Sequence, residues 1–351
     1  MNILILRLTT IISLVTAISV LTQCTSTPPQ STPGYLTKID SLLKNTEVEA
    51  FSGVILVAKK DSIVYFKTAG FADIANQVTL QKDNQFVIGS ISKQITAVMV
   101  LQAYERGAIE LHKVIGTYLP NLSQPWADSV TVHHLLTHMH GIEALDKPLN
   151  FKPGSRFNYS QLGYELLANI LEKVTNKTFA DLATELFAQC KMTNSYHPQR
   201  KKEAKLAKGY TANPNGKLVL ETQSLRNYVA AGSFISNVQD LVRWNQQLYG
   251  GKLLKPATYK LMETRYATRQ HPIFGEIEYG YGLTFEKNEH KKKIGALGFA
   301  PGYVSANFYF PQTQTSVVVL QNTARYLPNF RKTFFYQTNI LDIAKKGLVK
   351  D

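Results

Sequence analysis

Residues 86–97 read Phe-Val-Ile-Gly-Ser-Ile-Ser-Lys-Gln-Ile-Thr-Ala, and this stretch predicts a turn that runs into a buried helix. Ser90 and Lys93 are three residues apart, so on a helix both lie on one face and the Lys93 amine reaches the Ser90 hydroxyl. Apolar residues recur at helical spacing on another face, which we expect to be buried: Ile91, Ile95, Val98 and Met99. Arg106 and Gly107 are expected to end the helix.

The chemistry of this pair is that of a nucleophile with its own base. A serine at the start of a helix gains from the unpaired N–H groups and the dipole there, which stabilise developing negative charge. Lysine titrates near about 10.4 in water, so Lys93 accepts a proton only if burial or neighbouring cations lower its pKa. Alone, a Ser-x-x-Lys tetrad is weak evidence, because it is common by chance.

Other stretches follow this tetrad in a definite order. Residues 134–142 contain His-Leu-Leu-Thr-His and Gly-Ile, and residues 157–164 read Phe-Asn-Tyr-Ser-Gln-Leu-Gly-Tyr. With residues 230–244 and 295–302, the series resembles the serine β-lactamase and penicillin-binding-protein superfamily, in particular its class C and D-alanyl-D-alanine carboxypeptidase branch. The resemblance implies a mixed α/β fold, with an antiparallel sheet flanked by helices and an inserted helical lobe.

The same resemblance implies a role for individual residues. Ser90 would be the acylated nucleophile, Lys93 would assist its deprotonation, and Tyr159 would be the second proton carrier. The third motif of the family falls in residues 295–302. The oxyanion hole would use the backbone N–H of Ser90 and that of Phe299, on the strand of this third motif. No metal and no other cofactor enters this chemistry.

The chain also departs from the family's pattern. Gln161 stands where the family has asparagine, which changes the reach of the amide toward Lys93. Ala296-Leu297-Gly298 occupies the place of Lys-Thr-Gly or His-x-Gly, so Gly298 is kept and the side chain that recognises a substrate carboxylate is absent. This favours an ester or amide without that carboxylate, or lost catalysis. Alternatively, a basic residue from elsewhere in the chain supplies the missing charge in the cleft. The lysines at residues 291–293 are near in sequence.

The resulting hypothesis is an exported serine hydrolase that acts through a Ser90 acyl-enzyme on an ester, amide or peptide. Two alternatives stay open. One is a catalytically silent protein that binds a cell-wall peptide or a protein partner, and the other is a true β-lactamase or DD-carboxypeptidase. The expected partner in each case is a small molecule or a peptide, and the oligomeric state is left undetermined.

Residues 1–23 have the pattern of an export signal, with Arg7 before the apolar run 8–20. The following Leu-Thr-Gln-Cys resembles the lipobox of bacterial lipoproteins, so we expect a lipid anchor on Cys24 in the cell envelope, facing the periplasm or the exterior. A secreted, soluble enzyme is the alternative. Residues 24–34 form a tether, and residues 35–351 the hydrolase domain. Its sheet lobe spans about 35–85 and 270–351, and its helical lobe about 86–269.

Composition narrows the class of protein further. The 351 residues are 44% hydrophobic and 18% charged, which is typical of a globular chain. The formal net charge of +14 suits contact with anionic lipid or wall polymer, or simply a solvated surface. Nucleic acid is excluded by export and by the lack of an aromatic-interleaved basic motif. Four histidines look like a metal cluster, but we expect hydrogen-bonding roles for them: His133, His134, His138 and His140.

Patterns of β-branched and aromatic residues predict strands near both ends of the chain. Residues 51–58 and 63–69 are expected to form a hairpin, and residues 303–310 and 315–320 two late strands. Helical spacing dominates between them, and residues 330–346 are expected to close the chain as a helix. The sheet is therefore expected to combine strands from both ends, with the active site at the seam between lobes.

Overall fold

The computed structural model describes residues 33–45, 49–200, 205–223, 227–287 and 293–348. The predicted signal peptide, Cys24 and most of the tether lie outside the described residues. Among the helices that are described, none has the length and apolar character needed to cross a membrane.

An eight-stranded antiparallel sheet forms the centre of the fold, as predicted from both ends of the chain. Its strands lie in the order β2 (Ser62–Ala69), β1 (Gly53–Lys59), β14 (Thr315–Gln321), β13 (Tyr303–Phe310), β12 (Ile294–Ala300), β11 (Thr284–Glu286), β10 (Gly275–Tyr279) and β9 (Ala267–His271). The first predicted strand pairs with the last, since Val54 lies opposite Leu320. Together with the helices, this confirms the mixed α/β class.

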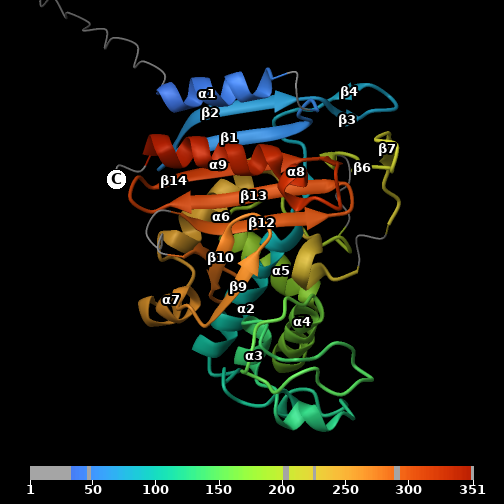
Figure 1. Ribbon diagram of the computed structural model, residues 1–351. Coiled ribbons are helices and arrows are strands. Elements are labelled where there is room, and N and C mark those ends of the chain that lie inside the picture. Colours follow the sequence, from blue (N-terminus) through green and yellow to red (C-terminus); the bar gives the residue numbers. More distant parts are fainter. Residues whose placement is uncertain (1–32, 46–48, 201–204, 224–226, 288–292, 349–351) are drawn as a thin grey trace, which may run out of the picture. The chain divides into compact units, whose positions relative to one another are not determined.

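The two faces of the sheet are both buried, which explains the near-continuous apolar runs of its central strands. Side chains alternate along β1, so Val54 and Leu56 enter the larger core while Ile55 and Val57 enter the smaller one. Helices α1 (Gly34–Leu43) and α9 (Phe335–Leu348) cover the smaller core, and Figure 1 shows α9 lying over the sheet, roughly along its strands. Helix α6 (Val238–Tyr249) packs on the other face.

Helix α2 (Ser92–Glu105) lies inside the larger core and is buried on nearly every side. It ends at Arg106, and Gly107 follows with φ of +74°, as the sequence predicted. The other helices are α3 (Val132–Leu136), α4 (Leu162–Thr175), α5 (Phe179–Gln189), α7 (Pro256–Glu263) and α8 (Phe330–Thr333).

The described residues also form three small sheets. They are β5 (Phe86–Val87) with β8 (Ile235–Ser236), β3 (Phe71–Asp73) with β4 (Val78–Thr79), and β15 (Thr323–Ala324) with β6 (Tyr210–Ala212) and β7 (Leu218–Leu220). The pairing of β5 with β8 matters most for the site, because it brings residues 229–233 beside the start of α2.

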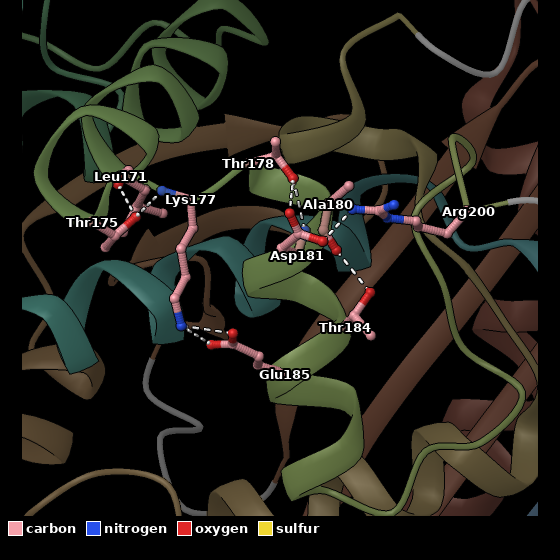
Figure 2. A network of polar contacts seen from close by, with 9 residues as sticks. All are labelled: Leu171, Thr175, Lys177, Thr178, Ala180, Asp181, Thr184, Glu185 and Arg200. Atoms are coloured by element: carbon pink, nitrogen blue, oxygen red, sulfur yellow. Dashed lines mark hydrogen bonds and ion pairs between the residues drawn. The ribbon is translucent and has the colours of Figure 1, made fainter.

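The junction between α4 and α5 shows how local polar contacts start a helix (Figure 2). The Thr178 hydroxyl accepts the backbone N–H of Asp181 at 3.1 Å and caps α5. Lys177 donates to both carboxylate oxygens of Glu185, and Arg200 forms an ion pair with Asp181. These ion pairs are exposed, so each contributes little to the free energy of unfolding, about 0–1 kcal/mol.

Candidate active site

Ser90 lies in a short 3₁₀ turn, Gly89–Ile91, directly before α2. Gly89 has φ of +57°, and a Cβ there would lie 2.3 Å from the backbone nitrogen of Phe299. Only glycine therefore lets this turn approach strand β12. The close approach places the half-buried Ser90 hydroxyl at the edge of the sheet.

Lys93 is 1% exposed, and its amine has three neighbours. Nζ lies 2.6 Å from Oε1 of Gln161, 2.7 Å from the backbone oxygen of Ala231 and 3.4 Å from Oγ of Ser90. A neutral amine has two hydrogens and one lone pair. When those two hydrogens bond the two carbonyl oxygens, the lone pair is available to accept the proton of the Ser90 hydroxyl.

Burial lowers the pKa of Lys93 below its ordinary value of 10.5. The nearby groups Tyr159 and Glu165 oppose this shift, and the positive charge of Arg269 adds to it. Burial also raises the pKa of Glu165, which weakens that carboxylate as a counter-charge for the amine. The environment thus shifts Lys93 toward the neutral form that a general base requires.

Tyr159 lies in the loop between α3 and α4, and its hydroxyl donates to Ser90 Oγ at 2.8 Å. His138 holds this loop on both sides of the tyrosine. Its backbone oxygen accepts the N–H of Asn158 at 2.8 Å, and its Nδ1 accepts the N–H of Ser160 at 3.2 Å. The His138 ring also packs against Tyr159, with 4.4 Å between ring centroids. The phenol is therefore held in place over the serine.

Gln161 immediately precedes α4, and its longer side chain does reach Lys93. The extra methylene relative to asparagine is accommodated, because the amide oxygen comes within 2.6 Å of the amine. The replacement seen in the sequence therefore keeps the contact to Lys93.

Strand β12 borders the site on its other side. A Cβ on Gly298 would lie 2.1 Å from the backbone oxygen of Ile88 and 2.2 Å from Oγ of Ser305. Gly298 therefore permits β12 to lie against the turn that carries Ser90. The backbone nitrogen of Phe299 faces Gly89 across this contact. The arrangement places the two predicted oxyanion donors, the N–H groups of Ser90 and Phe299, on adjoining segments.

Two cavities meet at this point. One, of about 550 Å³, extends over residues 206–209 and 220–223 and includes Gln161 and Phe299 in its wall. The other, of about 380 Å³, is lined by Ser90, Tyr159, Gln161 and Phe299 at its inner end. A substrate bound to Ser90 therefore has space on both sides of the reacting bond.

The second cavity contains residues that the sequence analysis did not single out. Arg269 and His271 project from β9, and Tyr279 ends β10. The Arg269 guanidinium lies 4.9 Å from the centroid of the Tyr159 ring. No sequence pattern within β9 marks this arginine as a site residue. It reaches the cavity that contains Ser90 because β9 pairs with β10 at the edge of the main sheet.

Lys293, one of the lysines considered as a substitute for the missing third-motif cation, does not line the cavity that contains Ser90. Lys293 is 2% exposed and pairs with Glu286 at 2.6 Å, with its amine over the rings of Phe274 and Phe308. Its ion pair holds it within the structure and off the cavity wall. Residues 291 and 292 lie outside the described part of the chain.

The four histidines make separate hydrogen bonds. Nδ1 of His133 bonds the Tyr281 hydroxyl at 2.8 Å, and Nε2 of His138 bonds the Tyr279 hydroxyl at 3.2 Å. His134 accepts the N–H of Thr131, and His140 accepts that of Ile142. Burial is the main cause that lowers the pKa of all four, so each ring favours its neutral form.

Comparison with known proteins finds relatives of one kind, by family model, by sequence and by structure. The model of the family described as Beta-lactamase matches residues 40–341. Penicillin-binding protein 4* of Bacillus subtilis is 25% identical over 79% of this chain and 69% of its own length. Teichoic acid D-alanine hydrolase of Staphylococcus aureus is 24% identical over 74% of this chain and 68% of its own. The octameric penicillin-binding protein homologue from Pyrococcus abyssi is 26% identical, with a TM-score of 0.73 over 90% of this chain and 78% of that one.

Proposed function

The chain belongs to the beta-lactamase family and is a serine hydrolase, and we propose that it acts by acyl transfer through an ester on Ser90. The observation that carries this proposal is the convergence of two proton-carrying groups on one hydroxyl. Ser90 Oγ lies 2.8 Å from the Tyr159 hydroxyl and 3.4 Å from Nζ of Lys93. The substrate proposed is an ester, amide or peptide.

In the first step, neutral Lys93 takes the proton of the Ser90 hydroxyl as the oxygen attacks the acyl carbon. The bond from Oγ to carbon forms, and the carbonyl electron pair moves to its oxygen. The backbone N–H groups of Ser90 and Phe299 stabilise this oxyanion, and the start of α2 adds its dipole.

In the second step, the bond from carbon to the leaving group breaks. Tyr159 gives its proton to the leaving oxygen or nitrogen, and Lys93 returns a proton to Tyr159. The Lys93 amine lies 4.6 Å from the centre of the Tyr159 ring, so the two proton carriers are neighbours. Water then attacks the Ser90 ester by the same route in reverse, which releases the acid and restores the serine.

The experiment that tests this proposal is turnover of a panel of p-nitrophenyl esters and a chromogenic cephalosporin. Ser90→Ala is expected to abolish turnover, and Lys93→Ala and Tyr159→Phe to lower kcat by about 10²–10⁴-fold. Ser62→Ala is the control, because Ser62 is exposed on β2. Absence of turnover by the unaltered protein over the whole panel would favour the silent binding protein instead.

We also propose that the protein is exported and held to the membrane by a lipid on Cys24. The apolar run 8–20 and the Leu-Thr-Gln-Cys that ends at Cys24 support this. Fractionation of cells that produce the chain tests it. Cys24→Ala is expected to move the protein from the membrane to the soluble fraction, whereas Cys190→Ala, at a buried thiol, keeps it in the membrane. A membrane-bound Cys24→Ala protein would contradict the anchor.

A further inference from the structure

Arg269 is a cation in the wall of the 380 Å³ cavity, and within the described residues no carboxylate forms an ion pair with it. Its guanidinium lies over the rings of Tyr159 and Phe157, at 4.9 and 5.3 Å from their centroids. Nε is buried and has no hydrogen-bond partner. Because no carboxylate in the described part of the chain pairs with this guanidinium, its N–H groups remain available to donate hydrogen bonds to an anion that enters the cavity.

The register of the sheet explains why the glutamates of the neighbouring strand do not neutralise this charge. Arg269 lies opposite Ile277, whereas the two glutamates of β10 lie opposite the residues on either side of it, Thr268 and Gln270. Successive side chains point to opposite faces of a strand, so Glu276 and Glu278 lie on the other face of the sheet. Glu278 pairs there with Arg265, at 3.2 Å.

The neighbouring wall of the cavity suits an anion with an apolar body. Ala296, where the family has a basic or imidazole side chain, lines the same cavity and leaves it open. His271 is neutral, because burial and then Arg269 lower its pKa to about 4, so Arg269 alone carries charge among these groups. Phe274, Phe330 and Phe334 add apolar surface to the wall. One cation balances one negative charge, which matches a carboxylate better than a doubly charged phosphate.

The position of Tyr159 tells which part of the substrate occupies this cavity. Tyr159 lines the 380 Å³ cavity and not the 550 Å³ one. In the proposed reaction it gives its proton to the leaving group, which must therefore lie on its side of the reacting bond. The acyl part then occupies the larger cavity.

We propose that Arg269 is the substrate-recognition cation of this enzyme, and that the preferred leaving group carries a carboxylate on an apolar body. The inference rests on the proposed function, since it assigns the leaving group from the role of Tyr159. The enzyme side chain that is absent from β12, which would recognise the substrate carboxylate, is thus replaced by one on β9, at the other end of four paired strands. This revises the expectation of a substrate without a carboxylate.

The test compares two phenylacetate esters that differ only in the leaving group, 3-hydroxybenzoate and its uncharged amide, 3-hydroxybenzamide. We expect the unaltered enzyme to prefer the carboxylate ester by about 10- to 100-fold in kcat/KM. Arg269→Gln is expected to bring the ratio close to one, and Arg269→Lys to keep part of it. Arg265→Gln is the matched control, because this arginine faces Glu278, and it is expected to leave the ratio unchanged.

The ratio is the decisive readout, because loss of the Arg269 charge also acts on Lys93 and slows both esters alike. An unaltered enzyme with no preference, or a preference that survives Arg269→Gln, would overturn the assignment. If neither ester is hydrolysed, the substrate panel decides the proposed function separately, and calorimetry with free 3-hydroxybenzoate and 3-hydroxybenzamide decides the inference alone. Tighter binding of the carboxylate that disappears in Arg269→Gln supports it, and equal binding overturns it.

Discussion

Oε1 of Gln161 lies 2.6 Å from Nζ of Lys93, so a side chain at the start of α4 accepts one hydrogen of the amine that faces Ser90. A neutral amide at this position accepts a hydrogen bond from the amine without adding negative charge. Because Lys93 must lose its proton to act as a base, the uncharged state of Gln161 is part of how the site keeps the lysine pKa low.

Gln161→Glu tests this relationship with almost no change of shape. A carboxylate at that distance is expected to raise the pKa of Lys93, so that less of the lysine is neutral near pH 7. The value of kcat/KM is then expected to fall by about 10- to 100-fold, and the acid limb of its pH profile to move to higher pH. Gln189→Glu, at the exposed end of α5, is the control. A Gln161→Glu profile that overlays that of the unaltered enzyme would contradict the role of Lys93 as base.

Gly298→Ala tests the contact between β12 and the turn of Ser90. The added Cβ would lie 2.1 Å from the Ile88 oxygen, so the strand must move and carry the N–H of Phe299 away from the serine. We expect kcat to fall by about 10²–10³-fold, as for the loss of one oxyanion donor. Gly34→Ala, whose Cβ meets open space, is expected to change nothing. Full activity in Gly298→Ala would show that β12 does not supply this donor.

The buried pair Asn245 and Asn307 joins α6 to the sheet. Each amide donates to the oxygen of the other, at 2.8 and 2.9 Å. Asn245→Ala leaves the Asn307 amide unpaired, and we expect a loss of about 1–3 kcal/mol in the free energy of unfolding, measured with urea. The variant that also carries Asn307→Ala is expected to lose less than the sum of the two single changes. Strict additivity would mean that the two side chains are not coupled.

The buried side chain of His140 is expected to lower the free energy of unfolding in mild acid. Burial, and secondly His134, lowers its pKa to about 4 from 6.5, and the side chain is 1% exposed. Between pH 6.5 and about 4 the unfolded chain binds a proton there and the folded chain does not, so stability falls as pH falls. The expected slope from this residue is about 1.4 kcal/mol per pH unit.

His140→Asn is the variant that checks this, because the asparagine oxygen replaces Nδ1 as acceptor for the N–H of Ile142. Urea unfolding at pH 7.5, 6.5 and 5.5 is expected to show a shallower dependence on pH for the variant than for the unaltered protein. Equal slopes for the two proteins would rule out His140 as a source of the acid sensitivity.

The elements set by local pattern were predictable from sequence. The hairpin of β1 and β2, the strands β13 and β14, and the helix that starts beside Ser90 follow from alternation, helical spacing and turn residues. Arg269 was not predictable, because β9 is short, half-exposed and placed by pairing with β10. The contact of Gln161 with Lys93 likewise depends on the exact placement of α4, which spacing alone does not give.

The most direct test of the Ser90 acyl-enzyme is to stop the reaction of the protein with p-nitrophenyl phenylacetate within its first turnover and to map the adduct by peptide mass spectrometry. We expect one phenylacetyl group on the peptide that contains Ser90, and none after Ser90→Ala. Acylation of a different residue, or an adduct that persists in Ser90→Ala, would contradict this expectation.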